Sequence, residues 1–232
     1  MSLLKLIGTL LDYPQDALWE HREELLDAAR DPALGAARRQ ALHAFVAQLL
    51  DTDPLQAQER WLELFDRGRS MSLLLFEHIH GESRDRGQAM VDLIDTYRRN
   101  GFELSARELP DYLPLVLEYL AQRPVDEARD WLQHIAHIVG LLAARAAERG
   151  SPYAVPLETL IEFAQGAVDL EALRHRARQE PRDDTPEVMD QLWEEEAVRF
   201  GAEAPAQDCS PPTTRRPHAA VTSRPVNPQV QP

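Results

Sequence analysis

The chain has 232 residues, one cysteine and a formal net charge of −14. This length allows one domain with a substantial core and excludes two large domains. Such an acidic chain repels phosphate backbones and anionic lipid surfaces, which argues against nucleic acid as a partner and favours a basic protein. The lone Cys209 excludes a disulfide within the chain and is typical of a reducing compartment.

Apolar residues recur at helical spacing along most of the chain, and no sustained strand-like alternation is present. We therefore predict an all-α fold, a single-domain helical bundle of about ten helices. In chain order, the expected helices are 2–12, 15–30, 34–51, 54–65, 71–81, 83–100, 106–122, 126–149, 156–166 and 169–178.

The N-terminal helix does not predict export or membrane insertion. Its apolar stretch is interrupted by Asp12, Tyr13 and Pro14, and no small-residue cleavage site follows. No stretch approaches the roughly 18 apolar residues that a membrane-spanning helix needs. We expect a cytoplasmic protein.

Local signals mark several helix ends. Asp53 followed by Pro54 is typical of an N-cap and a first helical residue. Gly101 and Gly150 stand where left-handed C-caps are expected.

Residues 65–87, "FDRGRSMSLLLFEHIHGESRDRG", place an apolar run between two arginine-glycine clusters. The arginines that flank the expected helix are Arg67, Arg69, Arg84 and Arg86. Two interpretations remain open. The arginines brace the turns around a buried helix with neighbouring carboxylates, or they contact the phosphate groups of a cofactor.

The same stretch contains the strongest candidate for metal chemistry. Glu77 and His80 form one E-x-x-H motif, which helical di-iron proteins use in pairs together with two further glutamates. No second motif is present, so we predict no metal site and keep a helical metalloenzyme using Glu77 and His80 as the alternative. "GESRD" lacks the second glycine of a nucleophile elbow, and no phosphate-binding loop is present, so no catalytic residue is predicted.

The segment "SARELPDYLPLVLEYL" predicts a helix with two apolar faces. Leu113, Val116, Leu117 and Leu120 form a core stripe. A second stripe consists of Tyr112, Leu115 and Tyr119, with Asp111 and Glu118 at its border. This second stripe is either buried or a groove that holds a basic amphipathic helix.

The pattern weakens towards the C-terminus. We divide the chain into an all-helical domain over 1–178, a linker with a short docking helix over 179–200, and a disordered proline-rich tail over 201–232. The tail has seven prolines and lacks the Leu, Ile, Met and aromatic residues that could offset its ordering entropy.

Three segments, "FDRGRSMSLLLFEHIHGESRDRGQAMVDL", "ELPDYLPLVLEYL" and "RDDTPEVMDQLWEEEAVRF", closely resemble the NarJ-type assembly chaperones of respiratory nitrate reductase, within the wider TorD and DmsD-like family. The resemblance covers about residues 1–200. The wider family's acidic-Pro-Asp-His motif is matched by Glu108, Pro110 and Asp111, with Tyr112 in place of histidine.

The resemblance implies a chaperone, not an enzyme. It would bind the N-terminal segment of the apo nitrate reductase α-subunit and promote insertion of the molybdenum bis-guanine dinucleotide cofactor before membrane docking, with the αβ complex as a further candidate partner. It would hold no cofactor stably itself. The residues expected to contact the client peptide are Phe76, His80, Glu108, Asp111, Tyr112, Leu115, Glu118 and Tyr119.

Overall fold

The computed structural model describes residues 2–80, 85–104, 108–185, 188 and 190. These residues form eleven α-helices and one 3-10 helix, and none of them belongs to a strand of a sheet. The elements are α1 Leu3–Leu11, α2 Ala17–Glu20, α3 Arg22–Ala28, α4 Ala36–Asp51, α5 Pro54–Phe65, η1 Arg69–Met71, α6 Leu75–His80, α7 Asp85–Arg99, α8 Leu113–Leu120, α9 Val125–Glu148, α10 Ala154–Ala164 and α11 Leu170–Gln179. The all-α prediction is confirmed.

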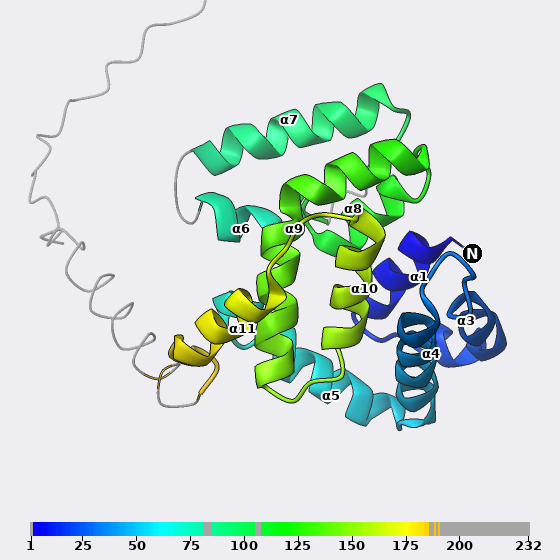
Figure 1. Cartoon of the computed structure of the whole chain (residues 1–232). Coiled ribbons are helices and arrows are strands. Elements are labelled where there is room, and N and C mark those ends of the chain that lie inside the picture. The colour runs from blue at the N-terminus through cyan, green and yellow to red at the C-terminus, as the bar shows by residue number, and fades with distance from the viewer. Residues whose placement is uncertain (1, 81–84, 105–107, 186–187, 189, 191–232) are drawn as a thin grey trace, which may run out of the picture. The chain divides into compact units, whose positions relative to one another are not determined.

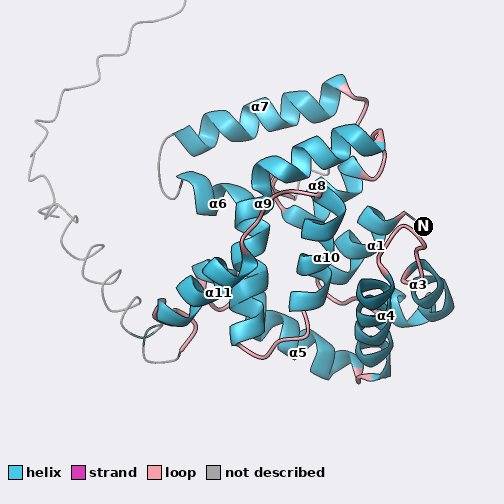
Figure 2. Cartoon of the chain, viewed as in Figure 1, coloured by secondary structure: helices cyan, strands magenta, loops and turns pink. Residues whose placement is uncertain are grey.

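The longest helix, α9, organises the fold. It packs against both α10 and α11, and Figure 1 shows α9 between these two helices. The N-terminal helix α1 packs against α8 and α10, and α4 packs against α10. Helices account for most of the described chain, with short loops between them (Figure 2). In the described part of the chain, no helix combines the length and apolarity that crossing a bilayer requires.

The core is built from leucine-rich faces of α1, α8, α9 and α10. Leu6, Ile7, Leu10 and Leu11 of α1 are completely inaccessible to solvent. Burial of each such side chain contributes about 1.5–3 kcal/mol. Gly8 lets α1 approach α8 closely, because a Cβ atom there would lie 3.1 Å from the Pro114 carbonyl oxygen and 3.3 Å from the Leu117 Cβ.

Three expected helices differ from those observed. The range 15–30 is divided into α2 and α3 at His21, whose backbone is not helical. The range 71–81 becomes η1 and α6, because residues 72–74 are not helical and Leu74 pairs in an antiparallel bridge with Tyr112. The range 106–122 contains α8 only from Leu113, since Pro110 and Pro114 disfavour helix before them. Residues 105–107 lie outside the described chain.

Several expected caps are confirmed. The Asp53 carboxylate accepts hydrogen bonds from the backbone N–H groups of Leu55 and Gln56, and Pro54 opens α5. Gly101 and Gly150 have φ angles of 76° and 66°, the left-handed region that favours glycine.

Residues 180–184, which we call the C-terminal strap, are held to η1 and α9. The Asp183 carboxylate accepts hydrogen bonds from the Ser70 backbone N–H, at 2.7 Å, and from the Ser70 hydroxyl. Arg149 donates to Asp183 at 3.3 Å, and Arg145 donates to Glu180 at 2.7 Å and to the Ser70 carbonyl at 2.6 Å. Gly68 leaves room for this contact, because a Cβ atom there would lie 2.6 Å from Asp183 Oδ1 and would displace the carboxylate.

The compact unit that contains the strap runs from Met1 to Asp190. The predicted division at residue 178 stays a prediction. The short helix expected around Leu192 and Trp193, and the disorder expected from residue 201, fall outside the described residues.

Candidate functional site

The segment before α8 is fixed by pairing with the segment before α6. The Leu75 N–H donates to the Asp111 carbonyl at 3.0 Å, and the Leu113 N–H donates to the Leu73 carbonyl at 2.9 Å. The Tyr97 hydroxyl donates to the Pro110 carbonyl at 2.7 Å. These contacts set the positions of the residues predicted to bind peptide.

Asp111 is completely buried, so it cannot form the expected acidic border of an open groove. Its Oδ2 accepts a hydrogen bond from the Phe76 N–H at 3.0 Å, at the start of α6. Within the described residues, its Oδ1 has no hydrogen-bond partner. Asp111 therefore positions α6 relative to α8. The expected exposure of Asp111 is wrong, because the segment before α6 pairs with the segment that contains Asp111 and encloses its side chain.

Leu115 and Tyr119 also belong to the core, with exposed fractions of 6% and 3%. The Tyr119 ring packs against Tyr97, with centroids 4.7 Å apart, and against Phe102 at 5.7 Å. Its hydroxyl accepts a hydrogen bond from the Asn100 side-chain amide at 2.9 Å. The buried alternative for the second stripe is thus the correct one at these two positions, because α7 and the turn after it cover Tyr119.

A cleft of about 170 Å³ remains beside this stripe, between α1 and α8. Four residues from the predicted set line it, namely Glu108, Tyr112, Leu115 and Glu118. The remaining lining residues are Lys5, Thr9, Asp12 and Pro114. Glu108 and Glu118 are exposed, whereas Tyr112 is half-buried.

Tyr112 joins the two walls of this cleft. Its hydroxyl donates to Asp12 Oδ1 at 2.9 Å, and the same oxygen accepts from the Tyr13 N–H at 2.8 Å. Burial and the neighbouring Asp12 carboxylate raise the pKa of Tyr112 well above its ordinary value, so the phenol stays protonated. Tyr112 can therefore present its ring to a ligand while its hydroxyl remains bound to Asp12.

A second cavity, of about 360 Å³, shares Lys5, Thr9 and Asp12 with the cleft. Its other lining residues are Tyr13, Gln15, Ala17, Leu18, His21, Glu24 and Leu25. We call the two cavities together the α1 cleft. Four carboxylates line it, those of Asp12, Glu24, Glu108 and Glu118, against the single ammonium group of Lys5.

This surface suits a basic, partly apolar peptide, because negative potential attracts cations and the half-buried Tyr112 ring offers apolar contact. The contribution of α1 was missed from the sequence. Asp12 and Tyr13 were visible there as an interruption of an apolar run, but the pattern could not show that α1 packs against α8.

Phe76 and His80 lie on α6 and form an edge-to-face pair with centroids 5.6 Å apart. Neither is among the residues that line the α1 cleft. Glu77, the other half of the E-x-x-H motif, pairs with Arg86 at 3.4 Å. Among the described residues, no three His, Cys, Asp or Glu side chains are grouped to hold a metal ion.

The arginine clusters divide among several environments. Arg67 pairs with Glu63 at 3.5 Å, and Arg86 pairs with Glu77. Arg69 opens η1, and Arg84 lies outside the described residues. The ion pairs of Arg67 and Arg86 favour the bracing interpretation, and contact with cofactor phosphates stays a prediction.

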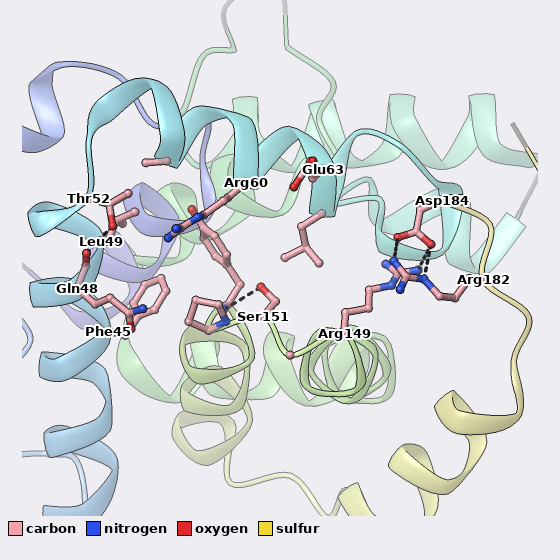
Figure 3. A pocket seen from close by; sticks show the side chains of 15 residues that line it. Phe45, Gln48, Leu49, Thr52, Arg60, Glu63, Arg149, Ser151, Arg182 and Asp184 are labelled. Atoms are coloured by element: carbon pink, nitrogen blue, oxygen red, sulfur yellow. Dashed lines mark hydrogen bonds and ion pairs between the residues drawn. The ribbon is translucent and has the colours of Figure 1, made fainter. Parts of the chain in front are cut away.

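A separate cavity, of about 410 Å³, lies between α4, α5 and the turn after α9 (Figure 3). At one end, Arg149 and Arg182 meet at Asp184, as Figure 3 shows. Because Arg149 also pairs with Asp183, two carboxylates balance these two guanidinium groups, and this end of the cavity offers little net charge to a partner. The α1 cleft has the larger charge imbalance, so it is the better candidate site.

Comparison with known proteins identifies a family. The sequence pattern of the family described as "Nitrate reductase delta subunit" matches residues 31–159. The chain is 50% identical to the nitrate reductase molybdenum cofactor assembly chaperone NarJ of Escherichia coli K12, over 88% of this chain and 86% of that protein. It is 45% identical to the probable chaperone NarW of the same strain, over 91% and 89% of the two chains. A probable NarJ of Bacillus subtilis is 33% identical over 67% of this chain and 84% of its own length.

Proposed function

The chain belongs to the nitrate reductase delta subunit family, and from this membership we propose that it is a chaperone for assembly of the molybdenum cofactor of nitrate reductase. The observation that carries this proposal is the 50% identity to a chaperone of that name over most of both chains. The chaperone acts as a binding protein and not as a catalyst. Glu77 Oε1 pairs with Arg86 at 3.4 Å, an interaction that competes with metal binding and so speaks against the metalloenzyme alternative.

The finer part of the proposal concerns the client. We propose that the chaperone binds the N-terminal segment of the apo α-subunit in the cytoplasm, alone or in the αβ complex, and keeps it able to accept the bis-guanine dinucleotide form of the cofactor. Holding the client open suffices for this role, so no resident cofactor is required.

The α1 cleft is the proposed peptide site. Its four carboxylates favour a segment with lysine or arginine, and the half-buried Tyr112 offers a ring for apolar or cation–π contact. Glu108, Tyr112 and Glu118 remain as proposed direct contacts, and the nearly buried Leu115 forms part of the cleft wall. Asp111 and Tyr119 are buried behind the cleft, and Phe76 and His80 are not among the residues that line it. We propose that these four residues contribute only indirectly, by positioning the walls of the cleft.

Calorimetry with a synthetic peptide of the client's first residues tests the site. Glu118 is exposed and lines the cleft, so Glu118→Lys should weaken binding by roughly tenfold, equivalent to about 1.4 kcal/mol. Glu59→Lys is a matched control, because Glu59 is an exposed residue of α5 and the charge change is identical.

Equal affinities of the Glu118 and Glu59 variants would remove the α1 cleft from the proposal. The chaperone role itself would be refuted if the peptide bound neither the wild-type chain nor the variants and the client subunit never co-purified with the chain. Charge reversal at Asp111 is unsuitable as a test, because a buried lysine there would disrupt the fold.

A further inference from the structure

Helix α11 is rich in arginine and poor in large apolar residues, which is more typical of a peptide that docks on a surface than of a core helix. None of its residues is buried, although it packs along α9 (Figure 1). Its apolar side chains Leu170, Leu173 and Ala177 are spaced i, i+3 and i+7 and are half-buried, while Arg174 and Arg178 stand beside them. It is thus a short basic amphipathic helix lying on an acidic protein.

The surface beneath α11 is shaped to accept such a helix. Gly140 of α9 opens a notch for it, because a Cβ atom there would lie 2.7 Å from Leu173 Cδ1 and 2.9 Å from Val168 Cγ1. Carboxylates on both sides receive the arginines. Arg174 pairs with Glu158 of α10 at 2.9 Å, and Arg178 pairs with Glu148 of α9 at 2.9 Å.

The docking surface extends beyond the part that α11 covers. A hollow of about 470 Å³ lies at its N-terminal end, lined on one side by Val168, Asp169, Ala172 and Leu173 and on the other by residues of α9 such as Ala136 and His137. This hollow opens to solvent, so it is a surface depression that adjoins α11. Because none of the residues of α11 is fully buried, its release from α9 exposes little apolar surface.

We propose that the face of α9 and α10 beneath α11, with its Gly140 notch and the carboxylates of Glu148 and Glu158, is a docking surface for a basic amphipathic helix supplied in trans by the client. In the free chain, α11 covers this surface as an intramolecular competitor. The surface is separate from the α1 cleft. The identity of the client rests on the proposed function, whereas the exchange of α11 does not.

The probe for this proposal is a fluorescent peptide with the sequence of residues 168–181. In the full-length wild-type chain, the tethered α11 competes at an effective concentration on the order of millimolar, so the probe should bind poorly. Leu173→Asp removes the side chain that enters the Gly140 notch and should raise probe affinity at least tenfold. Arg178→Glu should also raise probe affinity, because it breaks the ion pair with Glu148. This substitution changes only an exposed side chain, so we expect the fold to be retained.

Matched variants define the site of binding. His175→Ala alters an exposed residue of the same helix and should leave probe affinity at the wild-type value. Adding Glu148→Lys to the Leu173→Asp chain removes the carboxylate that pairs with Arg178 of the helix. The rise in probe affinity caused by Leu173→Asp should then disappear. Glu118→Lys in the α1 cleft should have no effect on the probe.

Equal probe affinity for the wild-type and Leu173→Asp chains would overturn the proposal. So would a rise in probe affinity that persists when Glu148→Lys is added to Leu173→Asp, or one that is lost when Glu118→Lys is added. Dimers of the wild-type chain that Glu148→Lys dissociates would identify a second copy as the occupant instead of a client helix. Because the probe is the chain's own helix, these results stand apart from any failure of the client peptide to bind the α1 cleft.

Discussion

Asp111 shows how a single buried carboxylate can join two helices. One oxygen accepts the Phe76 N–H, while the residue's own carbonyl accepts the Leu75 N–H. Removing the carboxylate would leave the partly buried Phe76 N–H without its present acceptor, which costs more than the hydrogen bond contributes. Asp111 is therefore best understood as a positioning residue for the wall that carries Tyr112.

We expect Asp111→Ala to lower the free energy of unfolding by about 1–3 kcal/mol, because the partly buried Phe76 N–H loses its acceptor. Urea denaturation followed by circular dichroism measures this. Asp95→Asn, at an exposed position of α7, is the control and should change stability by less than about 0.5 kcal/mol. A urea midpoint equal to that of the wild-type chain would contradict this prediction and would show that the Phe76 N–H finds another acceptor, such as water, in Asp111→Ala.

At the scale of elements, the contact between α1 and α8 decides whether the α1 cleft exists. Lys5, Thr9 and Asp12 come from α1 and the turn after it, while Tyr112, Leu115 and Glu118 come from α8 and its N-cap. Their approach depends on Gly8, which faces the Pro114 carbonyl. A wider spacing of the two helices would also break the Tyr112–Asp12 hydrogen bond.

Two glycines allow a matched test of this contact. Gly8→Ala should destabilise the chain by about 1–2 kcal/mol, because backbone atoms of α8 must move away from the new methyl group. Gly87→Ala in α7 meets no atom within 4 Å and should stabilise it by up to about 1 kcal/mol through helix propensity. Thermal unfolding of both variants is the measurement, and shifts of the same sign would contradict the close packing of α1 on α8.

At the scale of the whole described molecule, the C-terminal strap ties residues far apart in sequence. Asp183 bonds to Ser70, and Arg149 bonds to Asp183 and lies 3.6 Å from Asp184. Burial acts to raise the pKa of Asp183, but hydrogen bonds from Ser70 outweigh it and hold this pKa below its ordinary value. For Asp184, the hydrogen bond from Arg182 is the main cause of a lowered pKa.

A carboxylate with a lowered pKa in the folded state stabilises the fold above its unfolded pKa of about 3.9, and this contribution disappears as pH falls through the folded pKa. We therefore expect Asp183→Asn to be less stable than the wild-type chain at pH 7, and this difference to shrink as pH falls below about 4. Urea denaturation of both proteins across this pH range measures it. A difference that is constant with pH would show that the Asp183 charge plays no part in holding the strap.

The sequence by itself determined the fold class, most helix positions and the family, because these depend on local periodicity, capping residues such as Asp53, and long matching segments. Of the eight residues that it predicted to contact the peptide, Glu108, Tyr112, Leu115 and Glu118 line the α1 cleft, and their role in binding stays a prediction. It could not determine which apolar face of α8 is covered, since Tyr119 is buried by residues of α7 and its following turn that are distant in sequence. Only the tertiary structure brought Asp12 to Tyr112 and Asp183 to Ser70, because such contacts arise from packing of whole helices and leave no periodic trace in the chain.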